Sequence, residues 1–252
     1  MENSKNNYDW PQINQRYMDI LRCNQNATAL KFILSEEELN QIPNKTFPGL
    51  TMACEMIGLT GYYDKTYIIR TTDMPFDYCC INNGLRRKTE RWKSGIDLAS
   101  PPLQWFRTQE ESKKHSDALS DGIPKDLLFA IAASPIKTND IKEPDVISIV
   151  LQPGAAFYFL SGLIENNFRK IQFPVIGESS CIDTWGYTFN TGLPGLSFGC
   201  RGDRCLGAMG NDEVRLTVTP DDFVTAVNGM YRLYEGGVTY PFYPRWSESI
   251  FK

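Results

Sequence analysis

The segment 145–151, with the sequence DVISIVL, constrains the fold of this chain more than any other. A nearly continuous run of β-branched residues is typical of a strand that is buried on both faces. Further expected strands alternate with expected helices from end to end. This alternation predicts an α/β or α+β protein with a mixed sheet and flanking helices.

The other elements follow from periodicity, caps and turn residues. The expected strands are 27–34, 66–72, 127–132, a weaker one at 171–176, and 214–218. The expected helices are 7–25, a short one from 35, 49–59, 77–84, 101–119, 155–167, 179–189 and 223–234, with a loop over 86–100. No long linker interrupts the pattern, so we expect a single domain over 1–252. Its core covers about 10–235 and its aromatic tail, 236–252, covers either the body or a partner.

Charge and hydropathy exclude several classes of function. Lys and Arg total 26 against 30 Asp and Glu, a net charge of −4, which argues against a nucleic-acid binder. No apolar run approaches the roughly 18 residues of a membrane span, and we expect no membrane partner. The first ten residues are polar, without the apolar stretch of a signal peptide, which predicts a cytoplasmic protein with reduced thiols.

The chain has a single histidine, His115. Metal sites built from several histidines are therefore excluded. His115 lies in the charge run 110–117, which is typical of the solvent-exposed face of a helix. Any site for a soft metal must be dominated by cysteines.

Seven cysteines are present, two of them adjacent. Cys23 is expected to be a small core residue. The separation between Cys54 and Cys80 is 26 residues, and that between Cys181 and Cys205 is 24. Either a decayed duplication with two equivalent lobes or coincidence explains this likeness, and coincidence is the favoured interpretation.

Several segments together resemble the family catalogued as domain of unknown function 169, over about residues 10–235. They are ATALKFIL, GLTMACEMI, TYIIRTTDMPFDYCC and SSCIDTW…GLPGLSFGCRGDR…DEVRLTVTPDDF, of which GLSFGCRGDR is the most specific. The family occurs in archaea and in many anaerobic bacteria. Its cysteine pattern falls on Cys54, on Cys80 or Cys79, on Cys181 and on Cys200. The second position departs from the pattern, because Pro or Ala and then Gly-Leu often follow the family's cysteine. The resemblance implies a fold and does not establish an activity.

The first functional hypothesis is a metal centre held by dispersed cysteines, in a cytosolic protein of anaerobic metabolism. Thiolates suit zinc, copper(I) and iron–sulfur clusters. We expect Cys54, Cys80, Cys181 and Cys200 as ligands of an iron–sulfur cluster or another thiophilic metal, with Cys79 and Cys205 as substitutes. The centre would serve a redox reaction, with a redox partner protein, or activate a small ligand. Glycines of the turn around Cys200 leave backbone N–H groups free to approach a cluster or an anion; they are Gly199, Gly202 and Gly207. The structural alternative is that these cysteines are buried small hydrophobes.

The second hypothesis needs no metal. Cys200, beside Arg201, would be a nucleophile, with Glu178 as an acid or base and Asp183 or Asp203 as further bases if the fold brings them close. Alternatively, Arg201 and Arg204, helped by Arg70, would bind a small anionic ligand. Aromatic residues that could wall such a site, or belong to the core, are Tyr62, Tyr63, Trp185, Tyr187 and Phe198. The substrate and the oligomeric state, including a homo-oligomer through the aromatic tail, stay open.

Overall fold

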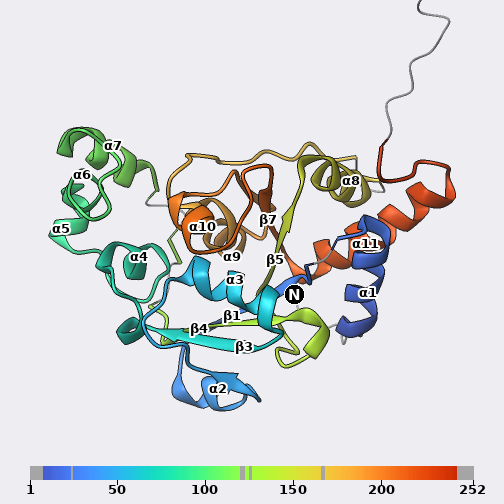
Figure 1. Cartoon of the computed structure of the whole chain (residues 1–252), viewed down its shortest axis with the longest axis horizontal. Coiled ribbons are helices and arrows are strands. Elements are labelled where there is room, and N and C mark those ends of the chain that lie inside the picture. The colour runs from blue at the N-terminus through green and yellow to red at the C-terminus, as the bar shows by residue number, and fades with distance from the viewer. Residues whose placement is uncertain (1–7, 24, 120–122, 125–126, 166–167, 243–252) are drawn as a thin grey trace, which may run out of the picture.

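A seven-stranded mixed sheet runs through the middle of the molecule, and helices cover both of its faces (Figure 1). The computed structural model describes residues 8–23, 25–119, 123–124, 127–165 and 168–242. The strand order is β2-β3-β4-β1-β5-β7-β6. The strands are β1 (Thr28–Ile33), β2 (Lys45–Thr46), β3 (Thr66–Arg70), β4 (Ala130–Pro135), β5 (Val146–Leu151), β6 (Gly195–Ser197) and β7 (Val214–Val218). The expected α/β architecture with a mixed sheet is confirmed.

The predicted buried strand, β5, lies at the centre of the sheet. It pairs antiparallel with β1, where Thr28 lies opposite Ser148, and antiparallel with β7 on its other side. Only β2 and β3 pair in parallel within the part of the chain that the structure describes. Because β5 has a neighbour on each side and helices on each face, its β-branched side chains are buried in both directions.

Three helices cover one face of the sheet: α1 (Trp10–Leu21), α8 (Pro153–Ile164) and α11 (Pro220–Glu235). Alternate strand residues, such as Ile147 and Leu216, pack against them. Helices α8 and α11 cross at glycines, since a Cβ on Gly229 would lie 1.9 Å from the carbonyl oxygen of Gly162. This layer contains no predicted site residue and serves as the structural support of the sheet.

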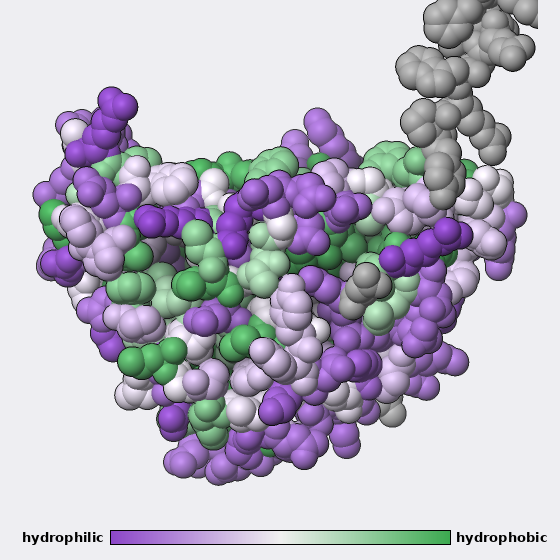
Figure 2. Space-filling model, viewed as in Figure 1, coloured by the Kyte–Doolittle hydropathy of each residue, from purple (hydrophilic) through white to green (hydrophobic). Residues whose placement is uncertain are grey.

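The opposite face carries α3 (Ala53–Tyr63), α4 (Asp77–Asn82), a π-helix (Ile182–Gly186) that continues as α9 (Tyr187–Thr191), and α10 (Arg201–Cys205). Beyond α4 lie α5 (Glu90–Lys93), α6 (Ile96–Ala99) and α7 (Gln109–Leu119), grouped at the left of Figure 1. We call residues 86–119 the cap. The short elements α2 (Glu36–Asn40), η1 (Thr71–Asp73) and η3 (Ile136–Thr138) complete the set of described elements. Figure 2 shows apolar side chains exposed among hydrophilic ones on the face of α3 and α10.

The two halves of the chain repeat one topology. The first half runs β1, α3, β3, α4 and β4, and the second runs β5, α9, β6, α10 and β7. In each half the last strand lies between the other two, and the halves meet at the antiparallel pair β1–β5. A pseudo-twofold axis perpendicular to the sheet relates this arrangement. The structure therefore favours duplication over coincidence as the reason for the similar cysteine spacing.

Several expected elements differ in the structure. The helix expected over 101–119 begins only at Gln109, because Pro101 and Pro102 restrict the backbone that precedes them and lack N–H donors. The segment 171–176 is not a strand, since no neighbouring strand pairs with it. The expected loop 86–100 contains α5, where Thr89 caps the helix by accepting a hydrogen bond from Trp92 N at 3.1 Å.

The aromatic tail begins against its own domain. Tyr240 stacks on Tyr158 of α8 with ring centroids 5.9 Å apart, and Phe242 contacts Phe157 at 5.6 Å. The rest of the tail, 243–252, lies outside the described residues. No helix in the described ranges is long and apolar enough to cross a bilayer.

Candidate functional site

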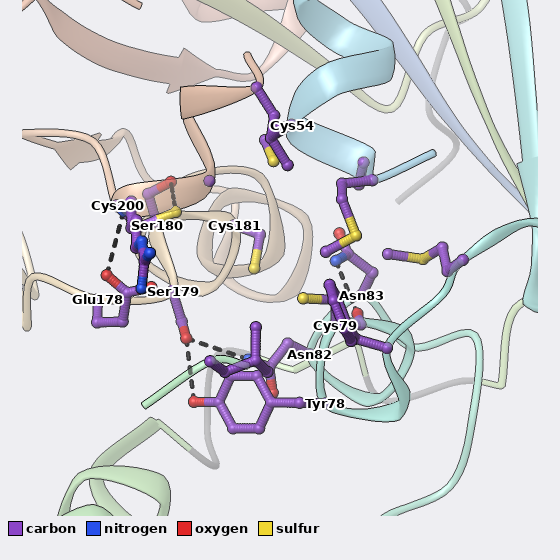
Figure 3. Close-up of a pocket in the computed structure, with 18 of the residues that line it drawn as sticks. Cys54, Tyr78, Cys79, Asn82, Asn83, Glu178, Ser179, Ser180, Cys181 and Cys200 are labelled. Atoms are coloured by element: carbon purple, nitrogen blue, oxygen red, sulfur yellow. Dashed lines mark hydrogen bonds between the residues drawn. The ribbon is translucent and has the colours of Figure 1, made fainter. Parts of the chain in front are cut away.

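Five cysteines line one cavity of about 290 Å³ on the face of the sheet that carries α3 and α10. They are Cys54, Cys79, Cys181, Cys200 and Cys205, which come from four different helical segments. Figure 3 shows the first four around the same space. The topology thus brings together cysteines that are up to about 150 positions apart in the sequence.

The repeat places the cysteines at the starts of helices. Cys54 is the second residue of α3, and Cys181 is the second residue of the helical stretch 180–191. In the second stretch the π-helix adds one residue per turn, which brings Gly186 and Thr188 to the places that Gly58 and Thr60 hold in α3. Cys200 is the N-cap of α10.

Two glycines let the cysteine helices approach each other. A Cβ on Gly202 would lie 3.0 Å from Cys54 Sγ and 3.5 Å from Cys200 Sγ, so any side chain at this position would occupy the space between the two sulfurs. A Cβ on Gly58 of α3 would lie 2.5 Å from the carbonyl oxygen of Gly207, which follows α10. The GCRG turn therefore needs Gly202 to keep both sulfurs facing the cavity.

The adjacent cysteines of α4 point in opposite directions. Cys79 faces the cavity, whereas Cys80 is fully buried under it and its thiol faces the carbonyl oxygens of Thr71, at 3.8 Å, and Met74. The expectation of Cys80 as a ligand with Cys79 as its substitute is wrong in this respect, because the rotation of α4 gives the cavity to Cys79.

Burial keeps the thiols of the cavity protonated. Desolvation raises the pKa of Cys54, Cys79, Cys181 and Cys200 above the ordinary thiol value. The charges of Cys200, Cys79 and Cys54 raise the pKa of Cys181 further, and those of Asp203, Cys200 and Cys79 do the same for Cys54. These mutual effects show that the four sulfurs lie within electrostatic range of each other.

Neutral polar groups form another part of the wall. Ser179 Oγ lies 3.1 Å from Tyr78 OH and accepts a hydrogen bond from Asn82 Nδ2 at 3.2 Å. Two buried tryptophans hold the asparagines: Trp92 donates to Asn82 Oδ1 and Trp185 donates to Asn83 Oδ1, both at 2.9 Å. Ser179 has a φ of +70°, a left-handed conformation that is uncommon for serine. The sequence analysis missed these residues, and no motif marks them.

Of the charged residues expected at the site, Glu178 and Arg201 line the cavity. Glu178 Oε2 accepts a hydrogen bond from Arg201 N at 3.2 Å, and burial raises the pKa of this carboxyl. Arg204 is not available for an anion, because its guanidinium donates to the carbonyl oxygens of Phe198 and Gly210. Gly199 also lies outside the cavity, and its N–H donates to Ser197 Oγ at 3.0 Å.

Other candidates lie elsewhere. His115 is buried, not exposed, and its ring contacts Phe106 at 5.0 Å, because α7 packs this face onto the cap. Arg70 pairs with Asp73 at 3.1 Å. Among the five aromatic residues suggested as a wall, Trp185 lines the cavity and the others do not. Cys23 packs at the edge of the core on the opposite face of the sheet, as expected.

No group of three or more His, Cys, Asp or Glu side chains among the described residues is placed to hold a metal ion. The sulfurs line the wall of the cavity and do not converge on one point. The cavity also has an apolar side, to which the cap contributes Leu98, Pro102 and Leu103. Such a wall suits an organic molecule as well as an inorganic one.

Comparison with protein families matches residues 17–229 to the family of domain of unknown function 169, which is described as uncharacterised ArCR. No curated protein and no solved structure matches the chain.

Proposed function

Because this chain belongs to the family of domain of unknown function 169, whose description assigns no activity, we propose a function from its own cavity. The protein holds an iron–sulfur cluster, or another polynuclear thiophilic centre, between Cys54, Cys79, Cys181 and Cys200. The observation that carries this proposal is that four cysteines from four helical segments line one cavity, with Gly202 leaving the space between two of them open. Four cysteine thiolates are the usual ligand set of [2Fe–2S] and [4Fe–4S] clusters.

The spread of the sulfurs favours a cluster over a single ion. A mononuclear site needs its ligands to meet around one point, and no described group of side chains does so. A cluster carries several metal atoms, so its ligands can stand apart on the walls of a cavity. Cys205, which is exposed at the edge of the same cavity, is the reserve ligand.

The protonation of the thiols supports a role as ligands more than a role as nucleophiles. A nucleophilic cysteine needs a lowered pKa, whereas burial raises the pKa of all four cavity thiols. A bound metal displaces these protons and stabilises the thiolates. The metal-free alternative, a cysteine nucleophile or an anion binder at the GCRGDRC turn, now depends on Arg201 and Glu178, since Arg204 is bound to backbone carbonyls.

The remaining wall suits a small ligand beside the centre. Apolar cap residues and Phe76 face one side, and Arg201 with Glu178 adds one cationic and one acidic group. We infer a redox reaction or the activation of a small, partly apolar molecule, which Arg201 would orient if it is anionic. A redox role requires a partner protein that exchanges electrons. Cytoplasmic, anaerobic metabolism is the setting that the family resemblance implies.

Anaerobic purification tests this proposal. The visible absorption spectrum, iron and acid-labile sulfide are measured on one sample, before and after reconstitution with ferrous iron and sulfide. We expect a broad charge-transfer band with stoichiometric iron and sulfide. A colourless protein that takes up neither iron nor sulfide would overturn the proposal.

Two neighbouring cysteines provide matched variants. Cys79→Ser removes a sulfur from the cavity, whereas Cys80→Ser changes a buried thiol that faces backbone carbonyls. We expect iron uptake to fall at least several-fold in Cys79→Ser and to persist in Cys80→Ser. Equal loss in both variants would show that the effect comes from disturbed folding of α4.

A further inference from the structure

A buried carboxylate lies directly beside one of the cavity sulfurs. Asp203, in α10, is fully buried, and its Oδ2 is 4.0 Å from Cys200 Sγ. Its Oδ1 accepts a hydrogen bond from Arg215 Nη2 at 2.8 Å. A buried ion pair is costly unless it has a specific task, and this pair ties the cysteine turn to the central strand β7.

One hydroxyl lies between the carboxylate and the sulfur. Ser180 Oγ donates to Asp203 Oδ2 and lies 3.5 Å from Cys200 Sγ. A hydroxyl has a single hydrogen to donate. While Cys200 is a thiol, its S–H can face Asp203 and the serine can donate to the carboxylate. When Cys200 becomes a thiolate, the serine hydrogen can turn to the sulfur.

The cation of the pair does not cancel the carboxylate at this sulfur. Arg215 is directed away from Cys200, with Nη1 donating to Ser148 Oγ at 3.2 Å and the guanidinium 5.6 Å from the Trp185 ring centroid. The pKa of Cys200 is raised by burial first and then by Asp203 and Glu178, while the Ser180 hydrogen bond lowers it. Carboxylate and hydroxyl thus act on the sulfur in opposite directions.

We propose that Asp203 and Ser180 set the electrostatic environment of the Cys200 sulfur: Asp203 disfavours added negative charge there and Ser180 favours it. This inference rests on the proposed function, because a cluster bound through Cys200 would take its reduction potential partly from these two groups. Net charge and hydrogen bonds to the sulfurs are known determinants of cluster potentials. Asp203 and Ser180 are therefore positioning residues that tune the centre without binding it.

The metal-free protein gives the first test. The rate of alkylation of Cys200 by iodoacetamide is measured across pH, with the modified peptide quantified by mass spectrometry. In Asp203→Asn we expect Cys200 to react several-fold faster than in the wild type at neutral pH. In Ser180→Ala we expect slower reaction. Asp183→Asn changes a buried carboxylate on the neighbouring helix and should leave the profile unchanged.

The loaded protein gives the second test, by redox titration. The midpoint potential should rise in Asp203→Asn and fall in Ser180→Ala. A bound cluster with the same potential in both variants would overturn this inference and leave the proposed function intact. If the wild type binds no cluster, the proposed function fails, and the alkylation profiles alone decide the role of Asp203 and Ser180. Should Asp203→Asn not fold, Ser180→Ala decides: an unchanged alkylation profile overturns the inference.

Discussion

At the scale of single residues, small groups decide the chemistry of the cavity. Cys79 and Cys80 are neighbours with the same side chain, yet one faces the cavity and the other faces backbone carbonyls. Burial raises the pKa of Cys80 to about 11, so its thiol is inert at neutral pH. Position relative to the cavity, and not residue type, separates a ligand from a core residue.

Gly202 is predicted to affect the centre and the fold in opposite ways. Gly202→Ala places a methyl group 3.0 Å from Cys54 Sγ and 3.5 Å from Cys200 Sγ. The substitution suits helix α10, since alanine is favoured over glycine in helices by about 1 kcal/mol. We expect iron uptake to fall several-fold, while urea unfolding shows unchanged or higher stability. Full iron uptake would show that the space between these sulfurs is not used.

Asp183 gives a prediction on pH. Burial raises its pKa to about 6, although it accepts hydrogen bonds from Ile176 N at 2.9 Å and Gly177 N. A carboxyl with a raised pKa in the folded state favours folding while it is protonated, and this contribution is lost as pH rises through about 6. Between about pH 4 and about pH 7, the wild type should lose about 1 to 2 kcal/mol more unfolding free energy than Asp183→Asn. Urea titrations at both pH values measure this, and parallel losses would contradict it.

At the scale of elements, the close contact between α3 and α10 fixes the distance between two cysteine-bearing helices. Gly58→Ala would place a Cβ 2.5 Å from the backbone oxygen of Gly207, so the helices must move apart. We expect a loss of about 2 kcal/mol in unfolding free energy, typical of overpacking, together with reduced iron uptake.

The same helix offers a control. A Cβ on Gly61 meets nothing within 4 Å, so Gly61→Ala should be neutral or stabilise the protein by about 0.5–1 kcal/mol. Chemical unfolding of both variants checks this pair. Equal destabilisation would show that helix propensity of α3, and not its contact with the GCRG turn, determines the result.

The elements that could be predicted are those with local signals. The strand β5 follows from its β-branched run, and α11 follows from Thr219, which caps it, and Pro220. The start of α7 and the short cap helices could not be predicted, because tertiary packing of Trp92 and His115 decides them. The π-helix has no sequence signature of its own and becomes visible only beside α3.

At the scale of the whole molecule, the repeat explains why the site lies where it does. Each half contributes two cavity cysteines, and the halves meet at β1–β5. The cap interrupts the symmetry, because about 47 residues join α4 to β4 whereas eight join α10 to β7. The cap therefore gives the cavity an apolar wall on one side.

The site could be predicted only in part. Cysteine content and the GCRG turn identified Cys54, Cys181 and Cys200, which line the cavity. The choice between Cys79 and Cys80 depends on helix rotation, which spacing does not determine. Ser180 and Asp203 reach Cys200 through the tertiary fold, so the sequence gave no reason to join the serine to them.

Proton release predicts how the loaded state responds to pH. Four thiols with raised pKa values must lose their protons when a centre binds, so apparent affinity increases with pH. We expect the reconstituted protein to resist a chelator better at about pH 8 than at about pH 6, and to unfold at a higher temperature than the metal-free protein. Iron release followed by absorbance checks the first, and anaerobic calorimetry the second. Release that is independent of pH would indicate ligands other than these thiols.

The most direct test of the central claim is anomalous diffraction at the iron absorption edge from crystals of anaerobically reconstituted protein. The account predicts an iron peak inside the cavity, bounded by the sulfurs of Cys54, Cys79, Cys181 and Cys200. A cavity without iron in crystals of protein that contains iron, or iron bound at another place on the chain, would contradict it.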